Sequence, residues 1–393
     1  MFKEIGKIGI PFTVLFFLYL LNPFGLNIYI GYLLVGLILL QRNFLVENLD
    51  LGFLLLFLFS LTYAAFFSFE PKAGSQYIII YALMPGTFYL LGKYFAHKID
   101  GNREHLVLFL LLIGAVFSIT ANLSVFMDIL QNGYNIVERN LPNYWTGQII
   151  PATIMGSYFT IVMAIPALLI PQVKKLSLLM KIALFATYII SIACVLRIGS
   201  RTQLSISMIA LLISLFYVMP RQSFKRNLFM FVLFALIVFF VINTVSFDLD
   251  QDWLSAFAGR MEDGGGEDIA SGGGRTERWI KSMENLFAKP LGWSEHEFGH
   301  AHNLWFDVLR IGGFLSFFLL ISFTTNAFIS VRKAIRKNKR AYALNNLIIV
   351  YTLSICMVFM VEPILEGMFD FFAFFCFFIG VVKKYNADYP VID

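Results

Sequence analysis

Apolar residues run along this chain in long blocks separated by polar segments. Such blocks suit membrane-crossing helices, which need roughly 20 apolar residues each. A bilayer cannot satisfy free backbone groups, so each block is a helix or a strand of a closed barrel, and these blocks are too long and too uniformly apolar for barrel strands. The pattern predicts about twelve helical spans, at 8–22, 27–41, 51–68, 77–96, 105–126, 149–170, 178–196, 202–219, 227–245, 304–330, 343–361 and 369–382.

The first two blocks are short, and the turn signal Asn22–Gly25 between them leaves open a single broken hairpin in their place. The first block has no small-residue cleavage site after it, so we do not interpret it as a removable signal peptide. No soluble domain is expected at either end, and residues 1–393 are predicted to form a single polytopic membrane domain.

Composition supports an all-α integral membrane protein. The 393 residues are 59% hydrophobic and 14% charged, whereas a soluble domain carries about 25% charged residues. The three cysteines lie in apolar blocks, which indicates packing rather than a disulfide framework or a metal site. Nothing in the pattern indicates nucleic-acid binding.

Lysine and arginine set the expected orientation, because cytoplasmic loops of membrane proteins are enriched in both. With both termini cytoplasmic, two thirds of these residues fall in short inner segments, and all five tryptophans fall on the outer side. The tryptophans are interpreted either as an interfacial belt or as platforms on which sugars stack. The cations that remain outside require a separate explanation.

Two external loops are expected, a first at 127–148 and a main loop at 246–303. The main loop opens with an acidic glycine-rich stretch, which is either a solvated flexible strip or a binder of divalent cations. Thr276–Ala288 then predicts a short amphipathic helix on the membrane surface, with Trp279, Ile280, Met283 and Phe287 on one apolar face.

Two pairs of outer arginines are candidate phosphate ligands, since guanidinium stays charged and its fork of donors matches phosphate oxygens. Arg197 and Arg201 have the spacing of one helix face, although Gly199-Ser200 can break the helix between them. Snorkelling toward lipid headgroups is the alternative. Arg275 and Arg278 follow the glycines of the main loop, which would let the backbone approach a ligand closely.

A histidine cluster precedes the span at 304–330. A histidine there can act as a general base, because its ordinary pKa is near neutrality. Zinc binding by His296 and His300 is an alternative, weakened by the lack of an HExxH motif and by Gly299. Asn303 and Asp307 are placed to orient an imidazole.

Taken in order, these elements resemble the O-antigen ligase/polymerase superfamily, whose members are integral membrane glycosyltransferases of the GT-C class. The resemblance covers roughly residues 190–330 closely. It rests on four short motifs: Gly199-Ser200-Arg201-Thr202, then Gly273-Gly274-Arg275 with Trp279 four residues on, then Pro290-Leu291-Gly292, and finally His302-Asn303 with Gly312-Gly313.

The resemblance implies a bacterial inner-membrane enzyme that uses undecaprenyl-diphosphate-linked oligosaccharides at the periplasmic face. Arg201 and Arg275 would stabilise the diphosphate leaving group, and His302 would act on the acceptor hydroxyl. Arg197, Arg278, Asn303, Trp279 and Arg139 are further candidate substrate ligands. No metal or cofactor is then required, and one displacement predicts inversion at the anomeric carbon.

We favour a polymerase of repeat units, with the growing glycan, the lipid bilayer and a chain-length-determining membrane protein as partners. The first external loop, with Arg139, would hold the growing glycan. A ligase that transfers the glycan to lipid A–core uses the same chemistry and is the alternative. A flippase or transporter is a more distant alternative. The unusual charges of a transporter should line a central cavity, whereas those of this chain are expected to gather on one face.

Overall fold

The computed structural model describes residues 6–69, 74–99, 102–134, 138–244, 251 and 274–388. The chain forms two compact units, each built from separate parts of the sequence. The first unit comprises Met1–Asn102, Gly266–Lys339 and Cys356–Asp393, and the second comprises Arg103–Gly265 and Arg340–Ile355. Residues 246–250 and 252–273 of the expected main loop, which include the glycine-rich acidic stretch and Gly273, lie outside the described residues.

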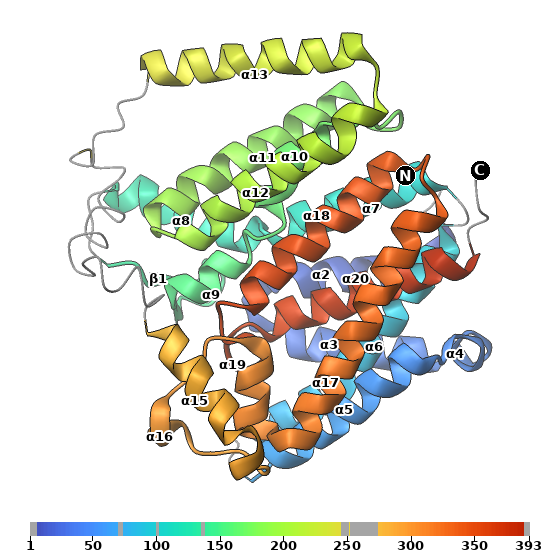
Figure 1. Ribbon diagram of the computed structural model, residues 1–393, viewed down its shortest axis with the longest axis vertical. Coiled ribbons are helices and arrows are strands. Elements are labelled where there is room, and N and C mark those ends of the chain that lie inside the picture. Colours follow the sequence, from blue (N-terminus) through green and yellow to red (C-terminus); the bar gives the residue numbers. More distant parts are fainter. Residues whose placement is uncertain are drawn as a thin grey trace. The chain divides into compact units, whose positions relative to one another are not determined.

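The first unit is helical throughout its described part (Figure 1). Its elements are α2 (Ile10–Leu21), η1 (Pro23–Gly25), α3 (Asn27–Leu39), α4 (Arg42–Asn48), α5 (Leu51–Phe67), α6 (Gln76–Lys98), α15 (Arg275–Ala288), α16 (Glu295–Phe298), α17 (Leu304–Lys337), α19 (Ile364–Gly367) and α20 (Phe369–Asp388).

Two helix pairs form the core of this unit, α6 with α20 and α5 with α17. Glycines allow the first pair to pack backbone against backbone. A Cβ added to Gly92 would lie 1.9 Å from the Phe377 carbonyl oxygen, and one added to Gly380 would lie 2.0 Å from that of Tyr89. Close backbone approach through small residues is how helices associate where surrounding lipid is as apolar as their side chains.

The second unit carries the remaining elements. These are α7 (Arg103–Phe117), α8 (Ile119–Asn132), β1 (Leu141–Pro142), β2 (Ile149–Ile150), α9 (Ala152–Ser157), η2 (Val162–Ala164), α10 (Ile165–Leu169), α11 (Leu178–Arg197), α12 (Arg201–Val218), η3 (Met219–Arg221), α13 (Phe224–Thr244) and α18 (Tyr342–Phe359), whose last turn belongs to the first unit.

The centre of the second unit is an irregular apolar segment. The block expected as one helix at 149–170 is broken into α9, η2 and α10, with Pro166 in the first turn of α10. Residues from Phe159 to Ala164 are almost fully buried. Irregular backbone is tolerated at membrane depth when protein surrounds it. β1, in the expected loop at 127–148, pairs antiparallel with β2, at the start of the block expected as the next span, in register Leu141 to Ile150.

Length and apolar composition mark seven described helices as able to cross a membrane, or eight if the bent pair α3–α4, with its 86° break, is one span. The chain is therefore an all-α protein of the multi-pass membrane type. The expected count of twelve is not confirmed. Two expected spans are represented by shorter apolar helices, α2 and α5.

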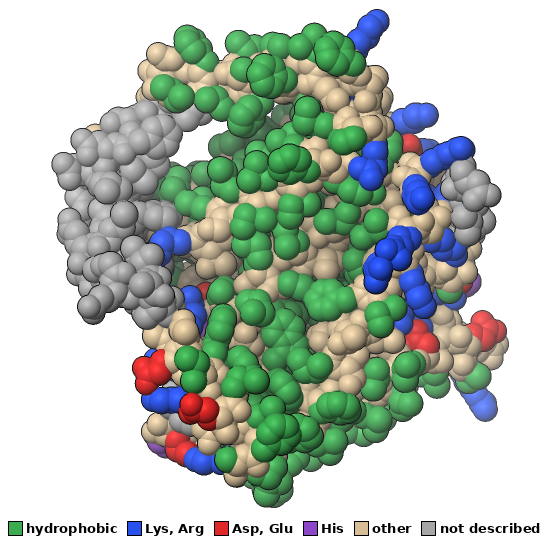
Figure 2. All heavy atoms as spheres, viewed as in Figure 1, with side chains coloured by type: hydrophobic (Ala, Val, Ile, Leu, Met, Phe, Trp, Pro, Cys, Tyr) green, Lys and Arg blue, Asp and Glu red, His purple; other side chains and the backbone are tan. Residues whose placement is uncertain are grey.

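Apolar and charged side chains lie on different parts of the visible surface. Figure 2 shows apolar side chains along the visible helices, and Lys and Arg gathered near the C-terminal end of α17. Within the first unit, the end of α6 and the end of α20 carry further cations, such as Lys93, which is paired with Asp50 at 2.6 Å. The opposite end of this unit holds α15, α16 and α19, together with the candidate site.

Candidate active site before α17

Helix α15 is fixed to the loop that leads into α17. The Arg278 guanidinium donates to the carbonyl oxygen of His300 at 3.0 Å, and the Trp279 indole N–H donates to that of Ala301 at 2.8 Å. The expected helix is confirmed, with its start at Arg275. Ile280, Met283 and Phe287 are exposed as expected for an apolar face. Trp279 is not part of that exposed face, because its indole faces the loop.

Asp307 and Asn303, which the sequence placed to orient an imidazole, instead hydrogen-bond to the backbone on either side of His302. Asp307 accepts hydrogen bonds from the backbone N–H of Ala301 at 2.8 Å and of Asn303 at 3.1 Å. Asn303 caps α17 by accepting from the N–H groups of Trp305 and Phe306. Between these anchors His302 has φ +52°, in the left-handed region. A non-glycine residue held there costs about 1–3 kcal/mol and is typical of functional sites.

The imidazole of His302 is kept neutral. Its Nδ1 is buried, and no side chain or backbone group in the described part of the chain hydrogen-bonds to it. Burial lowers the pKa of His302 to about 4, and the positive charges of Arg275, Arg278 and His300 act in the same direction. A neutral imidazole can accept a proton or a hydrogen bond from a substrate hydroxyl at its unprotonated nitrogen.

The pKa of His300 is shifted in the opposite direction. Its Nε2 lies 3.0 Å from a carboxylate oxygen of Glu295, and its Nδ1 lies 3.1 Å from one of Glu366. The hydrogen bond to Glu366 raises the pKa of His300 against the opposing effect of burial. The Arg310 guanidinium also lies 3.3 Å from Nδ1, so His300 is held by charged groups on both ring nitrogens and is a positioned side chain. Its ring centroid lies 6.2 Å from that of His302.

Two carboxylates of the site come from the connection between α18 and α20, which sequence reasoning did not single out. Glu362 lies 3.8 Å from the Arg275 guanidinium, and Glu366 pairs with Arg310 as well as with His300. The sequence does contain a signal for these two site residues, because Glu362 and Glu366 are acidic and lie in a short connection between apolar blocks. Arg310 is one of the cations that the expected orientation leaves on the outer side, and the sequence alone gave it no role.

The turn at Pro290–Gly292 and the glycine pair in α17 form one packing unit. Gly313 has φ +65° and interrupts α17, and the N–H of Phe314 donates to the Pro290 carbonyl at 2.8 Å. A Cβ on Gly292 would lie 2.1 Å from the Arg310 carbonyl oxygen. These glycines are needed because two backbones meet there. The contact places Arg310 beside the turn.

In the second unit, Arg197 and Arg139 hold protein groups. Arg197 is 1% exposed and forms a 2.8 Å ion pair with Asp128. It also donates to the carbonyl oxygen of Glu138, and Arg139 donates to that of Ile198. Together they fasten the first external loop to the end of α11, which gives both arginines a structural role in addition to the expected contact with substrate.

Arg201 differs from both. The chain breaks at Gly199, which has φ +62°, so Arg197 ends α11 and Arg201 begins α12. The Arg201 guanidinium is partly exposed, and no described residue forms an ion pair or hydrogen bond with it. It stands at a helix N-terminus, where free N–H groups and the helix dipole also favour an anion.

The structure thus brings together Arg275, Arg278, Trp279, His302 and Asn303 in the first unit, whereas Arg139, Arg197 and Arg201 belong to the second. The expected zinc alternative finds no support in residues 274–388, because His296 is exposed and His300 binds two carboxylates. No group of three potential metal ligands is found within the described ranges.

No protein-family model and no curated protein matches this chain.

Proposed function

We propose that the chain is a membrane glycosyltransferase that polymerises undecaprenyl-diphosphate-linked oligosaccharide repeat units at the periplasmic face of the bacterial inner membrane. The observation that carries the proposal is the neutral, strained His302 beside Arg275 and Arg278, with a buried Nδ1 that has no partner among the described residues. The motif order that resembles the O-antigen ligase/polymerase superfamily supports the same reaction.

In this reaction His302 removes the proton from an acceptor hydroxyl. The acceptor oxygen then bonds to the anomeric carbon of the donor sugar, while the bond from that carbon to the diphosphate oxygen breaks. The proton ends on His302 and the electron pair on the departing lipid diphosphate. A single displacement of this kind inverts the anomeric carbon. A positioned base contributes about 10²–10⁴-fold to such a step.

The leaving group gathers negative charge as the bond breaks, and guanidinium groups stabilise it. Arg275 is partly exposed, and its pairing with Glu362 at 3.8 Å is long enough to leave donors for a ligand. By the resemblance, Arg201 of the second unit would supply a second guanidinium, and it has no partner among the described residues. Such preorganised charges are commonly worth a few kcal/mol each in the transition state. This chemistry requires no metal ion, because the arginine side chains supply the positive charge that stabilises the leaving diphosphate.

The finer architecture belongs to the same proposal. We infer a GT-C-like arrangement of about twelve spans, with the short helices α2 and α5 among them. Both termini would be cytoplasmic, and α15, α16 and α19 would lie on the periplasmic side. The basic end of α17 and the glutamate-rich opposite end of the first unit support this orientation through the positive-inside trend.

Surface lipopolysaccharide from a strain that lacks this chain tests the proposal. A polymerase defect leaves core that bears a single repeat, because ligation still works, and a gel then shows one band above bare core. Bare core with polymer accumulating on the lipid carrier would indicate the ligase instead. An unchanged ladder would contradict both assignments for this polysaccharide.

The pH dependence of elongation follows from the pKa of His302. Only the neutral ring accepts a proton, so a pKa of about 4 leaves more than about nine-tenths of the base active at pH 5.5, whereas the ordinary value of about 6.5 would leave roughly one-tenth. We expect initial rates in vesicles to be nearly level from pH 7.5 to 5.5 and to fall as pH approaches 4. The H296Q variant, which removes an exposed histidine, should give the same profile. A midpoint near 6.5 in both proteins would contradict the assignment.

A further inference from the structure

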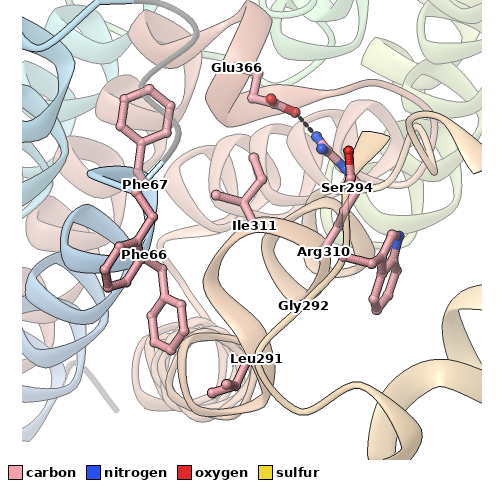
Figure 3. A pocket seen from close by; sticks show the side chains of 10 residues that line it. Phe66, Phe67, Leu291, Gly292, Ser294, Arg310, Ile311 and Glu366 are labelled. Atoms are coloured by element: carbon pink, nitrogen blue, oxygen red, sulfur yellow. Dashed lines mark hydrogen bonds and ion pairs between the residues drawn. The ribbon is translucent and has the colours of Figure 1, made fainter. Parts of the chain in front are cut away.

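A cavity of about 250 Å³ lies in the first unit, beside the candidate site. Figure 3 shows Phe66 and Phe67 on one side, Ile311 in the centre, and Glu366 meeting the Arg310 guanidinium across from the phenylalanines. The turn at Leu291–Ser294 closes another side. Polar and apolar groups contribute comparable shares of the walls, with Phe66 and Phe67 on one side and the Arg310–Glu366 pair at a polar edge.

The polar edge presents both donors and acceptors. Arg310 is 4% exposed, and its Nε is buried without an acceptor among the described residues. Glu366 lines the same cavity and offers carboxylate oxygens. A buried guanidinium N–H without an acceptor is costly, and about 1–3 kcal/mol is regained when a ligand supplies one.

The charges at this edge cancel. Arg310 is paired with Glu366, and His300 lies between Glu366 and Glu295. Arg310 and Glu366 are the charged residues among those that line the cavity, and because they pair with each other the lining carries no excess positive charge with which to attract phosphate. A lipid chain is also a poor occupant, because it would leave the buried polar groups unsatisfied.

We propose that this cavity binds one neutral monosaccharide of the glycan substrate. At about 30 Å³ for each water, the volume corresponds to roughly eight waters, the scale of a single sugar ring. The apolar face of the ring packs on Phe66 and Phe67, and its hydroxyls bond to Arg310 and Glu366. The identity of the ligand rests on the proposed function.

A direct path joins this sugar site to the reactive histidine. Glu366 lines the cavity and binds Nδ1 of His300 at 3.1 Å, and the rings of His300 and His302 lie 6.2 Å apart. We therefore assign the sugar in the cavity to the glycan unit that neighbours the reacting sugar unit. Glu366 is then a positioning residue, which binds the glycan and holds His300 in place.

Ligand-observed saturation-transfer NMR on the purified full-length protein in nanodiscs tests the proposal. The probes are neutral methyl hexosides, with inorganic phosphate as a competitor. We expect saturable binding of at least one hexoside, unaffected by phosphate. The variant I311W should fill the cavity and weaken binding more than about tenfold, the scale of discrimination that small changes in pocket volume produce. L315W, on the exposed side of the same helix, is the matched control and should bind as the unchanged protein does.

The proposal is overturned if no hexoside saturates the protein, if I311W binds as tightly as L315W, or if phosphate displaces the sugar. Should I311W fail to fold, F66A removes one aromatic wall and must weaken binding to a similar extent. The H302N variant separates this proposal from the proposed function. Sugar binding kept while elongation is lost supports both, whereas full elongation by H302N would remove the catalytic assignment and leave the sugar site standing.

Discussion

Replacing His302 with asparagine is expected to lower elongation about 10²–10⁴-fold, the usual contribution of a positioned general base. Asparagine is the informative substitution here, because His302 has φ +52° and asparagine tolerates the left-handed region. The amide cannot take up a proton, so chemistry is lost while the backbone is preserved. The measurement is the rate of polymer formation from lipid-linked repeat units, per amount of protein inserted in the membrane.

Two comparisons separate chemistry from folding in this experiment. H296N makes the same change at an exposed histidine and should leave elongation within about twofold, as surface substitutions do. H302A should lose activity as H302N does and melt at a lower temperature than H302N, because asparagine tolerates the left-handed region better than alanine does. Elongation by H302N at close to the normal rate would show that His302 does not act as the base.

Arg197 and Arg201, four residues apart, are expected to give opposite results when replaced with glutamine. R201Q should fold normally and lose about 10²–10³-fold in elongation, since the Arg201 guanidinium, which has no partner among the described residues, would stabilise the leaving diphosphate. R197Q should be destabilised by about 3–5 kcal/mol, because it leaves the buried Asp128 carboxylate without its partner. Thermal melting in detergent and elongation in vesicles, measured on both variants, resolve the two effects.

A second substitution controls for the ion pair. The double variant R197Q/D128N removes both charges and should recover part of the lost stability, because the two residues act as a pair. R201K retains charge but not the two-pronged donor geometry, and intermediate activity is expected. If R201Q elongates normally, or if it unfolds as R197Q does, Arg201 has no part in leaving-group stabilisation.

Local sequence signals predicted the elements of the site well. The amphipathic pattern after Gly274 predicted α15 to within one residue of its start, and the Pro290–Gly292 turn and the Gly312-Gly313 pair were both recognised. These local signals did not predict that the Pro290–Gly292 turn contacts the Gly312-Gly313 pair. That contact depends on tertiary packing, in which the Gly313 break frees a backbone N–H for Pro290.

Charge pairing was the least predictable part of the site. Arg197 and Arg201 carry the same sequence signal, yet one is buried against Asp128 and the other is free of described partners. The difference comes from a residue about seventy positions earlier in the chain, which no local pattern reveals. In the same way, the raised pKa of His300 depends on Glu366, which lies further along the chain, after both α17 and α18.

The break at Gly313 also determines how this region responds to the membrane around it. The part of α17 after Gly313, Phe314 to Lys337, is roughly 36 Å long at 1.5 Å per residue, enough to cross a bilayer core of about 30 Å alone. The nine residues before it, which include Asp307 and Arg310, form a separate short rod. When bilayer thickness changes, the long part can tilt to match it. We expect the bend to be absorbed at Gly313, so that the polar loop keeps its geometry in membranes of different lipid composition.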